Sequence, residues 1–361
     1  MELLGKLNYE AHKGRPLTPQ NKKITLWKPF QNFIHCCIES KGCRFSRKNG
    51  ACIMCDYGIG YNITPEELRK ELEVQLCPYV NNNTTVLFGT YGSILDTDEI
   101  SEKCFDEILD FIVKREIHSV IFETHCSTIN ENILKKIHEK LQINRVSVTI
   151  EMGYESCDEF VLKNCLNKFL NLAQLCSAIM LIHKYSMKVS LNVLLGAPFL
   201  SEKEQLDTAV QSVNWAFDKG ADSVVVFPCN IKPFTLLFEL YKKDFYKPVS
   251  QWLLVELLSR IPTEKLSQVT LSWYGDRKNF YENDRYPLIP PTDCEECHAM
   301  IFEFYHAFMK EPDAWQRRIL IDRILHAEKK CNCHDKVLQD LYVAQGRTKK
   351  DQIISLLEML N

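Results

Sequence analysis

The chain has 361 residues, of which 45% are hydrophobic and 25% are charged, and its formal net charge at pH 7 is -3. This composition is that of an ordinary soluble globular protein with room for one large core and an appendage. The slightly acidic balance argues against a broad nucleic-acid-binding surface, because such surfaces depend on Lys and Arg contacts with phosphates, although a local basic patch is compatible with it.

No apolar run reaches the roughly eighteen residues of a membrane span, and Asn8, Glu10 and Lys13 stand where a signal peptide would be apolar. We therefore expect a cytoplasmic protein without a membrane partner. The chain contains 16 cysteines, which is a high number for such a protein. In a reducing compartment, clustered cysteines indicate metal binding or catalysis more often than disulfides.

Short strands alternate with longer helices along most of the chain. Strand-length apolar runs lie at 33–38, 84–89, 118–123, 146–151, 189–195 and 222–227. A helix begins at the N-cap Thr64 with Pro65 in its first turn, and later helical periods cover 101–115, 130–141, 170–186, 203–218 and 249–260. Such βα units predict a parallel sheet, either partly closed into a barrel or open and doubly wound. In both arrangements the loops at the carboxyl ends of the strands carry the site.

The pattern divides the chain into three regions. We expect an N-terminal extension at 1–32, a core at 33–285 and a small helical C-terminal module at 286–361. Pro287, Pro290 and Pro291 interrupt the chain at the start of the third region. The region after them is predicted to contain helices with embedded cysteines.

Three cysteines follow the first predicted strand in the spacing C-x8-C-x2-C: Cys43, Cys52 and Cys55. Three thiolates can hold three irons of a 4Fe-4S cubane, and the missing fourth ligand leaves one iron open to chelate a small molecule. A zinc site needs a fourth ligand, which His35 or Cys37 is placed to supply, so structural zinc is the alternative.

The cysteine loop resembles that of the radical S-adenosylmethionine (SAM) superfamily. The usual spacing there is C-x3-C-x2-C, and the longer first gap is similar to the elongator-type branch and to the radical SAM subunit of archaeosine synthase. The resemblance continues through four later segments: Phe88–Asp96, Glu151–Ser156, Leu194–Leu200 and Pro228–Asn230. It implies a partial (β/α)6 TIM-like barrel with a cysteine-bearing C-terminal module, a 4Fe-4S cluster and bound SAM.

The resemblance also implies roles for individual residues. Met54 would lie against the adenine of SAM, as would Tyr57, and the turn containing Gly89, Gly92 and Ser93 would meet the amino group of its methionine part, unless it is only a tight turn. Glu151 and Glu155 are the candidate acceptors for the amino or ribose groups. Asn192 is a candidate ribose contact or a paired structural amide.

Three further residues at strand ends are candidates for the substrate side of the site. Glu123 closes the third predicted strand, and Cys229 and Asn230 follow the sixth. We expect Glu123 and Asn230 to face substrate. Cys229 either donates a hydrogen atom or packs in the core, and packing is the favoured reading.

Two close cysteine pairs lie near the end of the chain: Cys294 with Cys297, and Cys331 with Cys333. If helices bring the pairs together, four thiolates suit a tetrahedral zinc ion. The same sulfurs suit an auxiliary iron-sulfur cluster, and the third reading is that they bind no metal.

The sequence favours an enzyme over a binding protein. In the family it resembles, SAM is cleaved reductively and hydrogen is removed from a lysine-modified 7-deazaguanine base in tRNA, with cleavage of a C–N bond. For this chain we expect two kinds of partner. One is an electron donor such as flavodoxin or ferredoxin, and the other is a tRNA-modifying transferase or tRNA. A small-molecule or peptide substrate is the first alternative, and a non-catalytic, metal-stabilised partner subunit is the second.

Overall fold

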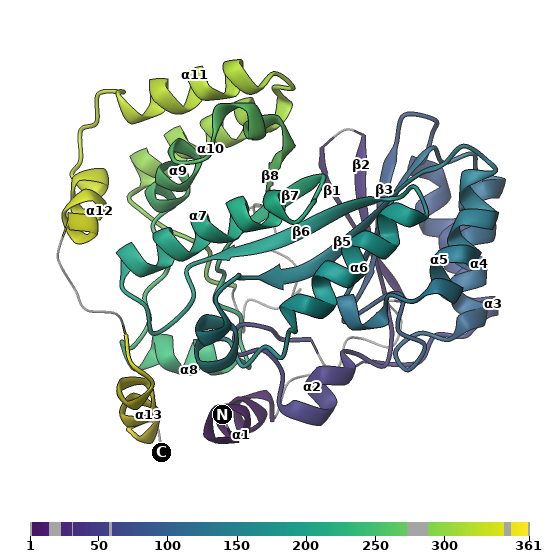
Figure 1. Cartoon of the computed structure of the whole chain (residues 1–361), viewed down its shortest axis with the longest axis horizontal. Helices are drawn as coiled ribbons and strands as arrows, with labels where there is room; N and C mark the ends of the chain where they lie inside the picture. The colour runs from purple at the N-terminus through teal and green to yellow at the C-terminus, as the bar shows by residue number, and fades with distance from the viewer. Residues whose placement is uncertain are drawn as a thin grey trace.

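The computed structural model describes residues 2–13, 23–30, 32–57, 60–272, 288–342 and 348–359. Eight strands form one sheet in the order β1 to β8. They are β1 (Ile24–Phe30), β2 (Phe33–Ile38), β3 (Thr85–Thr90), β4 (Ser119–Thr124), β5 (Ser147–Glu155), β6 (Lys188–Leu195), β7 (Ser223–Pro228) and β8 (Val269–Leu271). The sheet curls into a half-barrel, with helices against its outer side (Figure 1).

The helices alternate with these strands and then continue beyond them. They are α1 (Glu2–His12), α2 (Arg44–Asn49), α3 (Pro65–Glu71), α4 (Glu102–Lys114), α5 (Glu131–Ile137), α6 (Leu172–Lys184), α7 (Glu202–Asp218), α8 (Leu236–Lys242), α9 (Gln251–Ser259), α10 (Glu295–Lys310), α11 (Ala314–Leu325), α12 (Cys333–Tyr342) and α13 (Lys350–Glu358). None of the helices in the described ranges is long and apolar enough to span a membrane.

The predicted partial barrel is confirmed. Strands β2 to β8 run parallel, and the six strands predicted from the sequence are β2 to β7. The structure adds β1, which pairs antiparallel with β2, and the short β8. Pro29 lies within β1. Proline inside a strand is tolerated mainly at the edge of a sheet, so the sequence of this segment gives only a weak strand signal.

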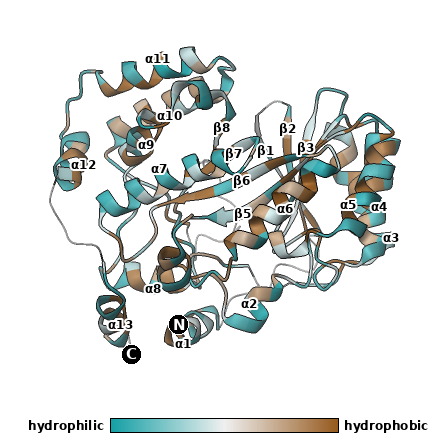
Figure 2. Ribbon diagram, viewed as in Figure 1, coloured by the Kyte–Doolittle hydropathy of each residue, from teal (hydrophilic) through white to brown (hydrophobic). Residues whose placement is uncertain are grey.

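The two faces of the sheet differ in chemistry because side chains alternate along a strand. In β4, Val120 and Phe122 are fully buried on the side covered by helices, whereas Ile121 and Glu123 face the concave side. Figure 2 shows hydrophobic residues along the strands and polar residues on the exposed helix faces. The concave face is therefore the place where polar groups are available for function.

The predicted start of α3 is also confirmed. The Thr64 side chain accepts a hydrogen bond from Glu67 N, and Glu67 Oε2 accepts one from Thr64 N at 2.9 Å. This reciprocal capping box, with proline in the first turn, satisfies amide groups that an α-helix leaves unpaired at its start.

The C-terminal helices gather at the end of the sheet opposite to α3, α4 and α5 (Figure 1). The predicted boundary near residue 285 lies outside the described residues. Arg317 of α11 fastens these helices to the core: its Nη1 donates to Leu266 O and Val269 O, and its Nε donates to Glu311 O, all at 2.6 Å. The guanidinium also lies 4.5 Å from the centre of the Phe308 ring.

Replacing Arg317 by Met should therefore destabilise the fold by about 3 kcal/mol or more, because two buried carbonyl groups and one partly buried carbonyl group lose a charged donor. Chemical denaturation of the variant measures the change in the free energy of unfolding. Arg323→Met, at an exposed position of the same helix, is the matched control and should change the stability little. Equal stabilities of the two variants would contradict this role of Arg317.

Candidate functional site

The cysteine loop follows β2 directly, as predicted. The eight residues between Cys43 and Cys52 include the short helix α2, and Cys43 stands at its N-cap. Gly50 ends the helix in the left-handed conformation, with φ of +78°. Cys55 N then donates to Cys52 O at 2.9 Å. The long first gap of the motif is therefore a helical turn rather than a flexible insertion.

The loop is held from outside by residues that sequence analysis did not identify. Asn8 of α1 donates to Gly50 O and, at 3.3 Å, to Cys52 O. The Nε2 atom of His12, on the same helix, lies 3.0 Å from Cys55 O. Asn167 donates to Ala51 O at 2.7 Å. The N-terminal helix is thus a structural support of the cysteine loop, which no local motif in its sequence indicates.

Two lysines place positive charge beside the cysteines. Lys168, whose side chain is 11% exposed, pairs with Glu155 at 3.1 Å, and Lys232 pairs with Asp56 at 3.1 Å. Burial raises the pKa values of the Cys52 and Cys55 thiols, while Lys168 and Lys232, respectively, lower them. The two lysines therefore favour the thiolate form that a metal ligand requires.

The loop cysteines do not form a compact ligand group with the two residues that could complete a zinc site. Among the described residues, the one group of three or more Cys, His or acidic ligands that comes within 4.8 Å of one another is elsewhere in the chain, in the C-terminal helices. His35 and Cys37 therefore do not complete a compact zinc site with Cys43, Cys52 and Cys55. In a cubane each cysteine binds a different iron, so wider spacing is what the ligands require.

Glu99 connects the glycine-rich turn to the cysteine loop. Its buried carboxylate accepts hydrogen bonds from Arg44 N at 2.6 Å and from Ser93 N. Burial raises the pKa of Glu99 to about 7. A Cβ on Gly92 would overlap this carboxylate and lie 3.0 Å from Cys43 Cα. The predicted residues Gly92 and Ser93 thus lie beside the cysteine loop, and Glu99, which sequence analysis missed, joins them to it.

A cavity of about 370 Å³ occupies the concave side of the sheet. Tyr57, Glu123 and Glu151 line it, together with His35. Glu123 and Glu151 are direct register partners on β4 and β5. Gly89 keeps the approach open, because a Cβ there would lie 2.8 Å from Glu123 Oε2 and 3.1 Å from His35 Nε2. Tyr57, two residues after Cys55, connects the cysteine loop with the cavity.

Glu151 is held in an environment that favours its protonated form. Burial, and secondly the charge of Glu123, raise the pKa of Glu151 to about 8, whereas a hydrogen bond from Asn192 lowers it. Asn192 Oδ1 is buried and has no hydrogen-bond partner within the described part of the chain. At neutral pH, Glu151 therefore favours the carboxylic acid form, which can donate a hydrogen bond into the cavity.

The remaining predicted residues lie around these two centres. Glu155 pairs with Lys168 beside the cysteines, and Met54 is half-buried against the hydrophobic core. Asn230 donates to Pro228 O at 3.1 Å, while its buried Oδ1 has no partner in the described ranges. Cys229 is 1% exposed and packs against Gly196, where an added Cβ would lie 3.2 Å from Cys229 Cβ. Cys229 does not line the cavity, which agrees with the packing interpretation.

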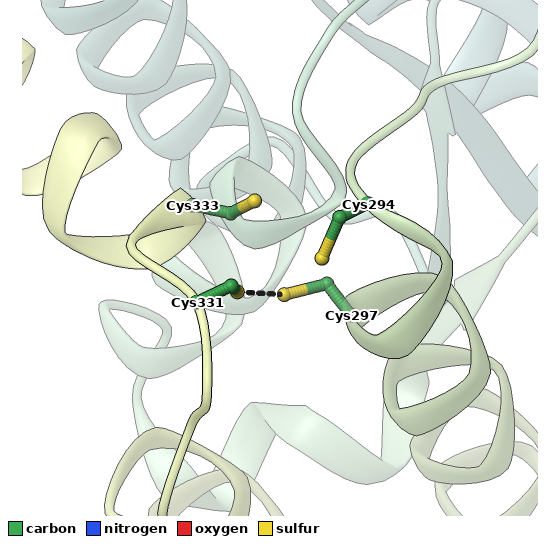
Figure 3. Close-up of side chains that lie close together, drawn as sticks. All are labelled: Cys294, Cys297, Cys331 and Cys333. Atoms are coloured by element: carbon green, nitrogen blue, oxygen red, sulfur yellow. Dashed lines mark hydrogen bonds between the residues drawn. The ribbon is translucent and has the colours of Figure 1, made fainter.

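The two late cysteine pairs converge, as the sequence predicts for a metal site. The sulfur atoms of Cys294, Cys297, Cys331 and Cys333 all lie within 4.8 Å of one another (Figure 3). Cys297 is fully buried, and the other three are partly exposed. These four residues form a second candidate metal centre, separate from the cysteine loop.

Comparison with known proteins identifies relatives in archaea. No protein-family model matches the chain. An uncharacterised protein of Methanocaldococcus jannaschii is 24% identical over 277 residues, which cover 72% of this chain and 75% of that protein. The archaeosine synthase beta subunit of Methanosarcina acetivorans is 25% identical over 61% of this chain and 64% of the subunit. That of Thermococcus kodakarensis is 26% identical over 60% of this chain and 68% of the subunit.

The archaeosine synthase beta subunits are the relatives that the cysteine loop and the later motifs predict, and the chain is similar to them in sequence. Among solved structures, native anSMEcpe with bound AdoMet and Cp18Cys peptide has a TM-score of 0.47 and 12% identity, covering 90% of this chain and 98% of that one.

Within the half-barrel, sequence analysis identified the cysteines of the loop but not the charged side chains that surround them. Lys168 lies in the segment before α6, and Lys232 follows β7. Both are single lysines in unremarkable local sequence, and only the fold brings them to the cysteine loop. The only local signal is that Lys232 follows a strand, a position that many surface lysines share.

The raised pKa of Glu151 predicts a pH-dependent stability. Because the folded protein keeps the proton that the unfolded chain loses near pH 4, the contribution of Glu151 to stability falls as the pH rises from about 4 to about 8. The Glu151→Gln substitution removes this pH-dependent loss of stability. Relative to the parent, the variant should gain stability across that range by at most about 1.4 kcal/mol per pH unit.

Denaturation of both proteins at several pH values between 4 and 9 measures this difference. Glu159→Gln, which removes an exposed carboxylate, controls for the change in net charge. A difference between Glu151→Gln and the parent that stays constant across the range would show that Glu151 ionises as freely in the folded protein as in the unfolded chain.

Proposed function

We propose that this chain is a radical SAM enzyme that holds a 4Fe-4S cluster through Cys43, Cys52 and Cys55. The observation that carries the proposal is the loop itself, in which three partly buried cysteines lie near Lys168 and Lys232, and Tyr57 of the same loop lines the cavity. When bound, the cluster and SAM supply a 5'-deoxyadenosyl radical that removes a hydrogen atom from the substrate. An external reductant such as flavodoxin or ferredoxin provides the electron.

The residues around the loop are suited to bind SAM. The turn at Gly92 and Ser93 places backbone close to Cys43, and Glu155 lies beside the cysteines with its partner Lys168. We assign the amino and carboxylate groups of SAM to this region, and its adenine and ribose to Met54, Tyr57 and Asn192. The unpartnered Oδ1 of Asn192 is an acceptor suited to a ribose hydroxyl group.

The interior cavity is suited to hold the reacting part of the substrate. Glu123 and protonated Glu151 both line it, so they can offer an acceptor and a donor to the same ligand. Asn230 follows the carboxyl end of β7, and its buried Oδ1 has no hydrogen-bond partner among the described residues. A group that carries both N–H donors and a carbonyl acceptor, such as the edge of a guanine-type base, fits this pair.

The substrate that best unites these observations is a modified 7-deazaguanine in tRNA, with C–N bond cleavage as the reaction. The names of the archaeosine synthase beta subunits support this assignment, and a tRNA-modifying transferase would then act in the same pathway. Small-molecule and peptide substrates are the alternatives to be assayed beside it. We assign Cys229 a packing role because it is buried away from the cavity.

The cluster assignment predicts the iron content. After anaerobic reconstitution, the protein should bind about four irons at the cysteine loop, and replacing Cys43, Cys52 and Cys55 together by Ala should remove them and abolish SAM cleavage. The matched control replaces Cys77, Cys157 and Cys176, three other partly exposed cysteines, and should keep both. Full iron content and SAM cleavage in the first variant would refute the assignment.

The substrate assignment predicts a different effect at Glu123. Glu123→Gln removes an acceptor from the cavity and leaves the cysteine loop untouched, so iron content and SAM binding should stay unchanged. Loss of one hydrogen bond to a charged group costs about 1.5 to 3 kcal/mol, so substrate binding should weaken roughly tenfold to a hundredfold.

The assay compares tRNA that carries the modified base with the free nucleoside, in both the parent and Glu123→Gln. Product formation from either, reduced in the variant, supports the assignment. Normal SAM binding with no turnover of the base in any form would reject a 7-deazaguanine substrate while leaving the radical SAM assignment intact. Loss of SAM binding in the variant would instead place Glu123 in the SAM site.

A further inference from the structure

We infer that Cys294, Cys297, Cys331 and Cys333 bind one zinc ion, and that this ion holds α10 in the position where it forms a wall of the interior cavity. The inference does not depend on the proposed function. It rests on the spacing of the four sulfurs, on the groups that contact them, and on the course of α10 from the cysteines to the cavity.

The spacing of the sulfurs selects a single ion over a cluster. Four sulfurs bound at about 2.3 Å to a tetrahedral zinc ion lie about 3.8 Å from one another. The four cysteine sulfurs all lie within 4.8 Å of one another, and those of Cys297 and Cys331 are 3.1 Å apart. In a 4Fe-4S cubane each cysteine binds a separate corner, which requires sulfurs farther apart than this.

The arrangement also differs from a pair of disulfides. The Cys297 and Cys331 sulfurs are farther apart than the roughly 2.05 Å of a bonded pair, and all four residues are free thiols. The sulfurs converge from two separate segments, one before and within α10 and one at the start of α12 (Figure 3). A shared centre explains why all four approach one point.

The groups around the sulfurs support a metal-bound thiolate. Trp252 of α9 donates its Nε1–H to Cys297 Sγ at 3.2 Å. The same indole stacks on the ring of His334, with centroids 4.4 Å apart, and His334 Nε2 lies 2.7 Å from Glu256 Oε1. Donors to the ligand sulfurs and a fixed second layer of contacts are typical of structural metal sites. Helix α9 therefore supports the site through Trp252 and Glu256.

Helix α10 connects this site with the cavity. Cys294 is its N-cap residue and Cys297 lies in its first turn, whereas Tyr305 and Met309 of the same helix line the cavity. Leu271 N of β8 donates to Met309 Sδ at 3.3 Å. An α-helix is stiff over this length, so fixing its first turn sets the position of its last turns. The ion would thereby close the side of the half-barrel next to β8.

Metal analysis of the full chain tests the first half of the inference. In the Cys43, Cys52, Cys55 triple-Ala variant, which lacks the loop cysteines, we expect about one zinc per chain and negligible iron. One iron or about four irons per chain would overturn the assignment to zinc. A metal-free protein with these cysteines joined in disulfides, detected by mass spectrometry, would overturn the metal site itself.

Hydrogen exchange tests the second half, in the same background. Cys331→Ser with Cys333→Ser should lose zinc and speed amide exchange in residues 298–310 at least about tenfold, with little change in α4. Cys157→Ser with Cys176→Ser is the matched control and should keep both zinc and protection. If the first variant fails to fold, amide exchange can be compared in the parent protein before and after zinc is removed with a chelator. Zinc loss without faster exchange in α10 would contradict its role in forming the cavity wall.

Discussion

The cost of burying ionisable thiols is the constraint on which the site depends. Burial raises the pKa values of Cys52 and Cys55, so the loop needs nearby positive charge and a rigid backbone before its sulfurs can serve as ligands. Lys168 and Lys232 supply part of that charge. Asn8, His12 and Asn167 hold the loop carbonyl groups. The loop is therefore positioned by segments that lie far apart in the sequence.

The half-barrel arranges two chemically different regions next to each other. Its carboxyl edge carries the cysteine loop and the Gly92–Ser93 turn, while its concave face carries the Glu123 and Glu151 pair. Tyr57 lies between them, since it belongs to the loop and lines the cavity. In the proposed function, the first region holds the cofactor and the second recognises the substrate. Helix α10 covers the side of the cavity beside β8.

Much of this architecture could be predicted, because its signals are local. The strands β2 to β7 are apolar runs of strand length, Thr64 and Pro65 form a standard helix start, and the cysteine spacing is specific. Strand β1 escaped prediction because Pro29 lies within it, and α1 because nothing in its sequence indicates a role at the loop. The roles of Glu99 and Lys168 depend on contacts between distant segments, which periodicity does not report.

The most direct test of the account is the electron paramagnetic resonance spectrum of the anaerobically reconstituted, reduced protein with and without SAM. If Cys43, Cys52 and Cys55 hold a cubane with one open iron, the reduced protein should show a 4Fe-4S signal that shifts when SAM binds that iron. A signal of this kind that SAM leaves unchanged, or no iron-sulfur signal from fully iron-loaded protein, would contradict the central claim.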